Sequence, residues 1–436
     1  MASTTSLWPI LLLITTASCA INRQAIVSRY NVTRTALIDN NTTPLQVGNG
    51  NFAYNVDNTG MQTFLPFNTL SSWAWHNDSL PENGNISDYH GVPMLTHGRN
   101  VSYDIPDPNL PEVSQWLIGN PNRINLGRIG LKYKGAALQA AQILNPVQEL
   151  DVWNGVITSA FDIDGEAVKV ITQGDFDSDS VVFRIESELV ISGALEIELD
   201  FPYPPIHSTK YKYEVFVGVG VLEFSANFAP ENQRADLPDT IRRRNSKGWN
   251  QYWSQGGFVD VTSSPNPKAD ELQRRIILSQ YHVRVNSAAD GQSPQESGLM
   301  NNGWYGKFHV EQVVWHNAHW CTWGRESHFD NVFPQLYETF LPSSLERAKL
   351  MGWEGARWPK MTETITGRSS PGGINGLLLW QQPHPMYLAE LRYKISPTKE
   401  TLERWDRVLT ATADYMASYA WLNETSGRYD LGPPRV

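Results

Sequence analysis

Cysteine is the residue this sequence has least of. Two cysteines occur among 436 residues, and Cys19 lies in a leader-like segment at the start. Once that segment is removed only Cys321 remains, which excludes an internal disulfide. No neighbour of Cys321 in the sequence would activate a thiol, so we interpret it as a small buried apolar residue.

Positive charge is also scarce. The formal net charge is −10, and the longest run of basic residues is 242–244, three arginines. This excludes the basic footprint of a nucleic-acid-binding protein and a polybasic membrane patch. We interpret the three arginines as a solvated face or a salt-bridge strip between domains, rather than as a phosphate site.

Long hydrophobic runs are missing, which excludes a membrane anchor because a spanning helix needs about 20 apolar residues. The apolar run at residues 7–14 is short, and Ser-Cys-Ala follows at 18–20. Residues 1–20 therefore predict a cleaved secretory signal and a secreted, extracellular protein. Seven N-x-S/T sequons agree with export, six of them before residue 101. They begin at Asn31, Asn40, Asn41, Asn77, Asn85, Asn100 and Asn423.

The first half of the chain carries the alternating pattern of β-strands. Apolar and polar residues alternate at 128–133, 155–161, 167–171, 181–185, 195–201 and 213–221. Asp164-Gly165 is a two-residue hairpin signal between two of these segments. Many strands at short spacing, with no helical pattern between them, predict an antiparallel β-sandwich over residues 21–240.

Beyond residue 240 the apolar period becomes that of a helix. Trp249 and Trp253, four residues apart, indicate a helical linker over 241–266. Further helices are predicted at 311–323, at 333–351 with a break near Pro342, and at 382–393. A regular apolar stripe from Leu402 to Tyr419 predicts one more. We expect a multidomain β + α protein, with helical hairpins filling 267–436.

Aromatic residues gather at 298–359. Six of the 16 tryptophans lie there, among histidines, carboxylates and basic residues. Flat rings beside rigid polar groups are typical of a carbohydrate cleft. A tryptophan-rich helical core is the alternative interpretation. His316 and His319 have a spacing that metal ligands use, but no third ligand is apparent, so we expect no metal and no cofactor.

Four blocks of the helical half resemble glycoside hydrolase family 65 of the six-hairpin glycosidases, in the same order. They are SGLMNNGWYGKFHVE at 297–311, LERAKLMGWEGARWP at 345–359, QQPHPMYLAE at 381–390 and GRYDLGP at 427–433. The resemblance implies a β-sandwich, a helical linker and an (α/α)6 barrel. The chain departs from the family where Val310-Glu311 replaces W-D and where Lys360-Met361 follows Pro359 in place of W-E, so substrate identity does not carry over.

The resemblance also implies a chemistry. The family's general acid is the glutamate of a G-P-D-E segment, which would come at or beyond Val436, so we expect an incomplete barrel and a C-terminally truncated chain. The expected function is a secreted glycoside hydrolase that cleaves an oligo- or polysaccharide with inversion. A disaccharide phosphorylase, a polysaccharide lyase and an inactive sugar-binding fragment are the alternatives.

Six residues are candidate sugar contacts, while the catalytic residues stay unassigned. Glu311 takes the position of the family's substrate-binding Asp, although a carboxylate at a helix start is the alternative. His384 lies between two prolines that fix its backbone, and either donates to a hydroxyl or closes a loop. Stacking or hydrogen bonding to a sugar is expected from Trp304, Tyr305, Glu311, Trp358, Lys360 and His384. The expected partner is a carbohydrate, and neither nucleic acid nor membrane.

Overall fold

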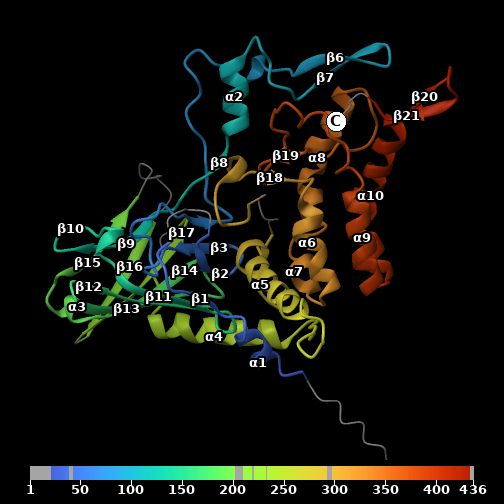
Figure 1. Cartoon of the computed structure of the whole chain (residues 1–436). Coiled ribbons are helices and arrows are strands. Elements are labelled where there is room, and N and C mark those ends of the chain that lie inside the picture. Colours follow the sequence, from blue (N-terminus) through green and yellow to red (C-terminus); the bar gives the residue numbers. More distant parts are fainter. Residues whose placement is uncertain are drawn as a thin grey trace, which may run out of the picture.

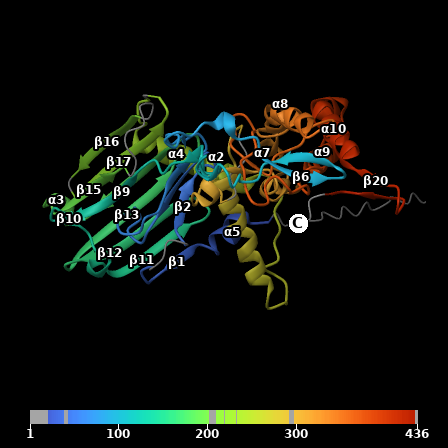
Figure 2. The same ribbon diagram turned by 90° about the horizontal axis from the view of Figure 1, so that it is seen from above.

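The computed structural model describes residues 21–38, 43–201, 210–218, 220–231, 233–291 and 297–432. The signal segment 1–20, the sequons at Asn40 and Asn41 and the last four residues lie outside these ranges. The chain combines antiparallel sheets with helices, as the sequence predicted (Figure 1). The seven-stranded sheet lies on one side of the molecule and helices α6–α10 on the other (Figure 2).

A seven-stranded antiparallel sheet is the largest layer. Its order is β1-β11-β12-β13-β14-β17-β16. The bounds are β1 Val32–Arg34, β11 Leu144–Asp151, β12 Val156–Ile163, β13 Glu166–Gly174, β14 Ser180–Glu186, β17 Val221–Ala229 and β16 Lys210–Gly218. The alternation is clearest in β12, where every second residue is buried and the residues between are more exposed. Asp164-Gly165 does turn between β12 and β13, in the left-handed conformation.

The sequence pattern was wrong at one strand. It predicted a single strand over 213–221, whereas the chain forms β16, turns around Gly220 and returns as β17. The sequence Val-Gly-Val-Gly-Val at 217–221 continues the alternating pattern of a strand. The pattern therefore gave no sign of the turn. Gly220 has a φ of 72° that suits glycine.

Smaller sheets cover one face of the large sheet. They are β2-β3-β4 (Leu45–Gly48, Phe52–Val56, Thr69–Ser71) and β10-β9-β15 (Ala136–Ala137, Arg128–Tyr133, Leu195–Asp200). The Tyr54 ring packs edge-on against Phe183 of the large sheet at 5.3 Å, and its hydroxyl donates to the Ile129 carbonyl at 2.8 Å. Two-stranded pairs among the described residues are β5-β8 (Trp75–His76, Asn122–Arg123), β6-β7 (Val92–Thr96, Arg99–Tyr103), β18-β19 (Phe308–His309, Met361–Thr362) and β20-β21 (Trp421–Asn423, Arg428–Asp430).

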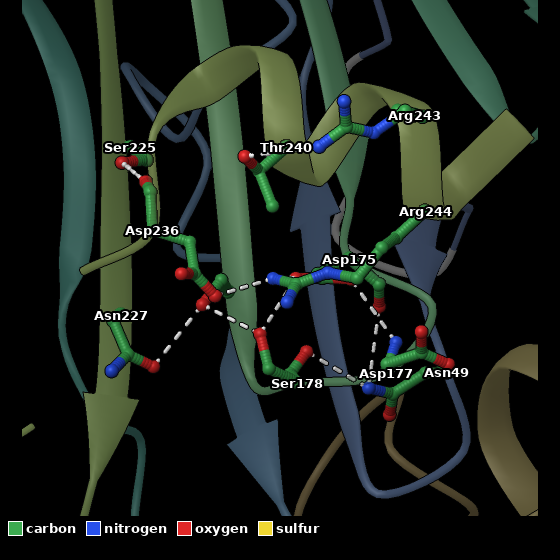
Figure 3. Close-up of polar contacts among 11 residues, drawn as sticks. Asn49, Asp175, Asp177, Ser178, Ser225, Asn227, Asp236, Thr240, Arg243 and Arg244 are labelled. Atoms are coloured by element: carbon green, nitrogen blue, oxygen red, sulfur yellow. Dashed lines mark hydrogen bonds and ion pairs between the residues drawn. The ribbon is translucent and has the colours of Figure 1, made fainter. Parts of the chain in front are cut away.

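Helix α4 (Pro238–Ser254) lies against the opposite face of the large sheet (Figure 1). The expected salt-bridge strip is present: Arg242 pairs with Glu223 of β17, and Arg244 with the fully buried Asp175. Figure 3 shows Arg244 reaching Asp175 and Asp236, while Arg243 points away. At the other end of the helix, Trp253 Nε1 donates to the Val152 carbonyl at 3.0 Å.

The remaining helices form a packed group. Contacts join α5 to α6, α6 to α7 and α9, and α10 to α8 and α9. Their bounds are α5 Ala269–Ser287, α6 Val313–Thr322, α7 Glu326–Asp330, α8 Gln335–Leu350, α9 His384–Ile395 and α10 Lys399–Tyr419. Shorter helices are α1 Arg23–Ser28, α2 Pro111–Gly119, α3 Glu188–Ile191 and the 3₁₀ turns Ile86–Asp88, Ala140–Gln142 and Gly303–Gly306. The (α/α)6 barrel stays a prediction.

The expected break near Pro342 is wrong, because α8 runs unbroken through it. A proline inside a helix costs about 3 kcal/mol. The buried face of α8, which includes Tyr337, Phe340 and Ala348, offsets that cost. One hydrophobic core runs from Ile26 in the N-terminal part to Ala411 in α10. The domain boundaries proposed from the sequence stay predictions. Among the described helices, none is both long and apolar enough to cross a bilayer.

Candidate functional site

A short antiparallel pair brings two distant stretches of the chain together. Strand β18 (Phe308–His309) pairs with β19 (Met361–Thr362). The Val310 N–H then donates to the Lys360 carbonyl at 2.9 Å. As a result, residues about fifty apart in the sequence, Glu311 and Lys360, face each other.

The pair forms a buried polar cluster. Lys360 Nζ lies 3.0 Å from Glu311 Oε1 and 3.1 Å from His309 Nδ1. Only 4% of Lys360 and 7% of Glu311 are exposed. Burial raises the pKa of Glu311, but its interactions with His309 and Lys360 outweigh burial and lower the pKa overall. Glu311 is therefore an ionised hydrogen-bond acceptor at neutral pH, not a proton donor.

Trp304 lies over this cluster. Its ring is 4.9 Å from Lys360 Nζ, and it meets the His309 ring edge-on at 5.8 Å. Even so, 56% of Trp304 is exposed. An exposed indole above a buried cation and carboxylate can offer a flat face to a ligand whose hydroxyls reach the charges below.

The backbone at Trp304 and Tyr305 is strained. Both residues have positive φ, 54° and 62°, which bulky side chains rarely adopt. Strain of this kind persists only where the surroundings fix it, and it clusters at functional sites. The turn separates the two rings: Tyr305 lies toward α2, where its hydroxyl accepts from Gln115 Nε2 at 3.2 Å.

His384 begins α9 beside the same cluster. Its Nδ1 lies 3.2 Å from the Val310 carbonyl. Burial lowers its pKa, although the Val310 contact and the charge of Glu311 oppose this. The imidazole is thus neutral at pH 7, with Nδ1 donating to Val310. Trp380, which the sequence reasoning missed, meets the His384 ring edge-on at 5.3 Å and is exposed. Its place just before the QQPH block was the available signal.

Trp358 lies in the core instead of at a surface. It is 0% exposed, and its Nε1 donates to Thr412 Oγ1 of α10 at 3.0 Å. The Tyr337 ring packs edge-on against it at 5.0 Å. No face of this indole is open to a sugar. The core interpretation of the aromatic stretch holds for Trp358, while the cleft interpretation fits Trp304.

Lys307 is a second residue that sequence reasoning did not single out. Its Nζ donates to the carbonyls of Leu117 at 3.0 Å and Asn120 at 2.8 Å, and to Ser370 Oγ. Burial lowers its pKa to about 7, with the charge of Glu363 opposing. This lysine ties the Trp304 turn to the end of α2.

The helical histidines hold no metal cluster. Burial lowers the pKa of His319 to about 4, and its ring packs on Trp320 at 4.2 Å. In the described part of the chain, no three His, Cys, Asp or Glu side chains converge in a way that could hold a metal ion.

Comparison with known proteins found similarity to solved structures but not to family models or curated sequences. No family model and no curated protein match the chain. A solved structure named "Putative kojibiose phosphorylase from human microbiome" is similar at a TM-score of 0.59 and 10% sequence identity. The similarity covers 92% of this chain and 61% of that one, so this chain spans about three fifths of its length. At this identity the likeness shows the fold alone, a combination of antiparallel sheets with a group of helices.

Proposed function

We propose that this chain belongs to a secreted carbohydrate-active enzyme that stacks a sugar ring on the exposed face of Trp304, next to the Lys360–Glu311 pair. The observation that carries the proposal is the exposed indole 4.9 Å above a buried ammonium, which itself lies 3.0 Å from a carboxylate. A sugar ring presents an apolar C–H face and a polar rim of hydroxyls. Trp304 suits the face, and Glu311 and Lys360 suit the rim.

Each residue has one role in this scheme. Glu311 accepts hydrogen bonds from hydroxyls and Lys360 donates to ring or hydroxyl oxygens. His384 borders the sugar, whereas Trp358 stays in the core, where its Nε1 donates to Thr412. The reaction is hydrolysis with inversion, in which an acid and a base carboxylate stand about 6.5–9.5 Å apart with water between. Because Glu311 stays ionised, it is not that acid.

Phosphorolysis is the second candidate, favoured by the likeness to a structure named as a phosphorylase. The proposed secretion favours hydrolysis, because an enzyme outside the cell cannot depend on a steady supply of phosphate. The two reactions differ in products. Hydrolysis of a glucose disaccharide releases only glucose, and phosphorolysis also releases glucose 1-phosphate.

Binding and turnover test the proposal separately. Calorimetric titration with kojibiose, maltose and trehalose should show binding that Trp304→Ala weakens about tenfold, or about 1.4 kcal/mol. Trp315→Ala, at an exposed tryptophan of α6, should leave affinity unchanged. Incubation of the bound sugar with and without inorganic phosphate then separates the two reactions. Absence of binding to all three sugars, or equal effects of the two variants, would reject the sugar site.

A further inference from the structure

A hollow adjoins the Trp304 turn on the side of α2. Its volume is about 790 Å³. Helix α2, the loop at residues 78–81, strand β8 and the turn at Asn302 and Tyr305 line it. A cavity of this size falls in the range that holds a small ligand. None of the sequence motifs or comparisons assigns it a role.

Two aromatic rings of this hollow are held in fixed positions. Trp116 Nε1 donates to the carbonyls of Asp78 at 3.1 Å and Ser79 at 3.0 Å. Tyr305 is fixed by its hydrogen bond from Gln115. Rings anchored at their polar ends lose little conformational freedom when a ligand stacks on them, which favours binding.

The polar lining suits hydroxyl groups. Asn302 Nδ2 donates to the Arg123 carbonyl at 2.8 Å, and its buried Oδ1 has no hydrogen-bond partner among the described residues. An orphaned buried acceptor next to a hollow marks a place for a ligand donor. Gln115 and Asn122 add further amide groups to the lining.

The charges of the lining exclude an anionic ligand. Asp78 and Glu112 contribute carboxylates. Arg123 is the basic residue of the lining, but its guanidinium is buried and already donates to the carbonyls of Ser71 and Gly306. A uronate or phosphate would therefore meet uncompensated negative charge.

We infer that this hollow is a second saccharide subsite, which takes a neutral hexosyl unit of an oligosaccharide whose next unit stacks on the exposed face of Trp304. The inference rests on the proposed sugar site. Trp304 and Tyr305 are consecutive, so their Cα atoms are about 3.8 Å apart, and their strained turn directs one ring to each site. The substrate class that fits both sites is a neutral oligosaccharide longer than a disaccharide.

Affinity as a function of chain length tests the subsite. Linear neutral glucose oligosaccharides of two and four units are titrated by calorimetry into the wild type and into Trp116→Ala and Gln115→Ala. The wild type should bind the tetrasaccharide at least tenfold tighter than the disaccharide. Both variants should lose most of that advantage and keep the disaccharide affinity. Gln115 is exposed, so its variant keeps the test valid if Trp116→Ala folds poorly.

Each outcome separates the two proposals. If the disaccharide binds and Trp304→Ala weakens it, but the tetrasaccharide binds no tighter, the subsite is rejected and the primary site stands. Equal loss for both sugars in both variants also rejects the subsite. If neither sugar binds the wild type, both proposals fall. A tetrasaccharide ending in glucuronic acid should bind at least tenfold more weakly than the neutral one, and equal binding would overturn the assignment of ligand class.

Discussion

Single residues at the site are constrained by burial as much as by any ligand. Lys360 and Glu311 are nearly inaccessible, yet both are charged. Removing a charge from water is costly, and the opposite charge, the hydrogen bond that Lys360 donates to His309 Nδ1 and the Trp304 ring offset that cost. Loss of one partner therefore leaves the other buried without compensation.

We predict that Glu311→Gln destabilises the fold by about 3 kcal/mol, because it strands the Lys360 ammonium. Urea denaturation of the wild type and the variant measures this. The double variant Glu311→Gln with Lys360→Met should recover part of the loss, since no unpaired charge remains. Additive losses in the double variant would show that the pair is not energetically coupled.

A carboxylate among the β-strands, that of Asp179, should make the free energy of unfolding depend on pH. Trp73 Nε1 donates to Asp179 Oδ2 at 2.6 Å. Burial raises the pKa of Asp179 to about 6, although hydrogen bonds from Trp73 and Asn49 oppose the rise. A carboxyl with a raised folded-state pKa favours the folded state while protonated. That contribution is complete below pH 4 and disappears as the pH rises through 6.

The difference in unfolding free energy between wild type and Asp179→Asn should therefore fall by on the order of 2 kcal/mol between pH 4 and pH 7. Denaturant titrations across that range measure the difference. Asp177→Asn, in the exposed part of the same loop, is the matched control and should give a flat difference. A flat difference for Asp179→Asn as well would contradict the raised pKa.

How far the sequence identifies site residues depends on burial, which one sequence does not reveal. Glu311, Lys360, Trp304 and His384 do gather in space as a consequence of the short β18–β19 pairing. Trp358 has the same composition and neighbours as a stacking residue, but a partner 54 positions later, Thr412, buries it. Contacts over that separation leave no local trace in the sequence.

At the scale of elements, the three arginines of helix α4 differ in the contacts that they make. Arg244 reaches Asp175, which is fully buried, and Arg242 reaches Glu223, whereas Arg243 makes one long contact with Thr240 at 3.5 Å. The sequence predicted a salt-bridge strip here but could not rank its members. The ranking comes from which side of the helix meets the sheet (Figure 3).

We predict that Arg244→Met lowers the free energy of unfolding by about 3 kcal/mol, because Asp175 is then a buried carboxylate without a counter-charge. Arg243→Met should change it by less than about 0.5 kcal/mol. Thermal and chemical denaturation of the two variants side by side give the comparison. Similar losses for both variants would mean that the Arg244–Asp175 salt bridge makes no specific contribution to stability.

At the scale of the whole molecule, the sequons divide by the contacts of their asparagines. Asn31 is already engaged: its Nδ2 donates to Glu149 at 2.8 Å and its Oδ1 accepts from the Val152 N–H at 3.1 Å. A glycan on Nδ2 would break the first bond and crowd the strand pairing of β1 with β11. The sequence alone marks all seven sequons as equal.

If the chain is exported as we propose, Asn77, Asn85 and Asn100 should carry glycans, because all three are exposed on one N-terminal segment. Asn31 should remain unmodified. Mass spectrometry of peptides from protein secreted by a eukaryotic host, before and after enzymatic deglycosylation, measures the occupancy of each site. Full occupancy of Asn31, or none at the three exposed positions, would contradict the prediction.

The strained turn at Trp304 and Tyr305 lowers the stability of the fold, while it presents two rings for ligand binding. A left-handed backbone costs an ordinary residue roughly 1–2 kcal/mol, and glycine escapes that penalty. Laboratory evolution for thermal tolerance alone would therefore drift toward glycine at these two positions and discard both rings. A thermostable variant that still binds ligand should therefore keep Trp304 and Tyr305 and carry its stabilising substitutions elsewhere in the chain.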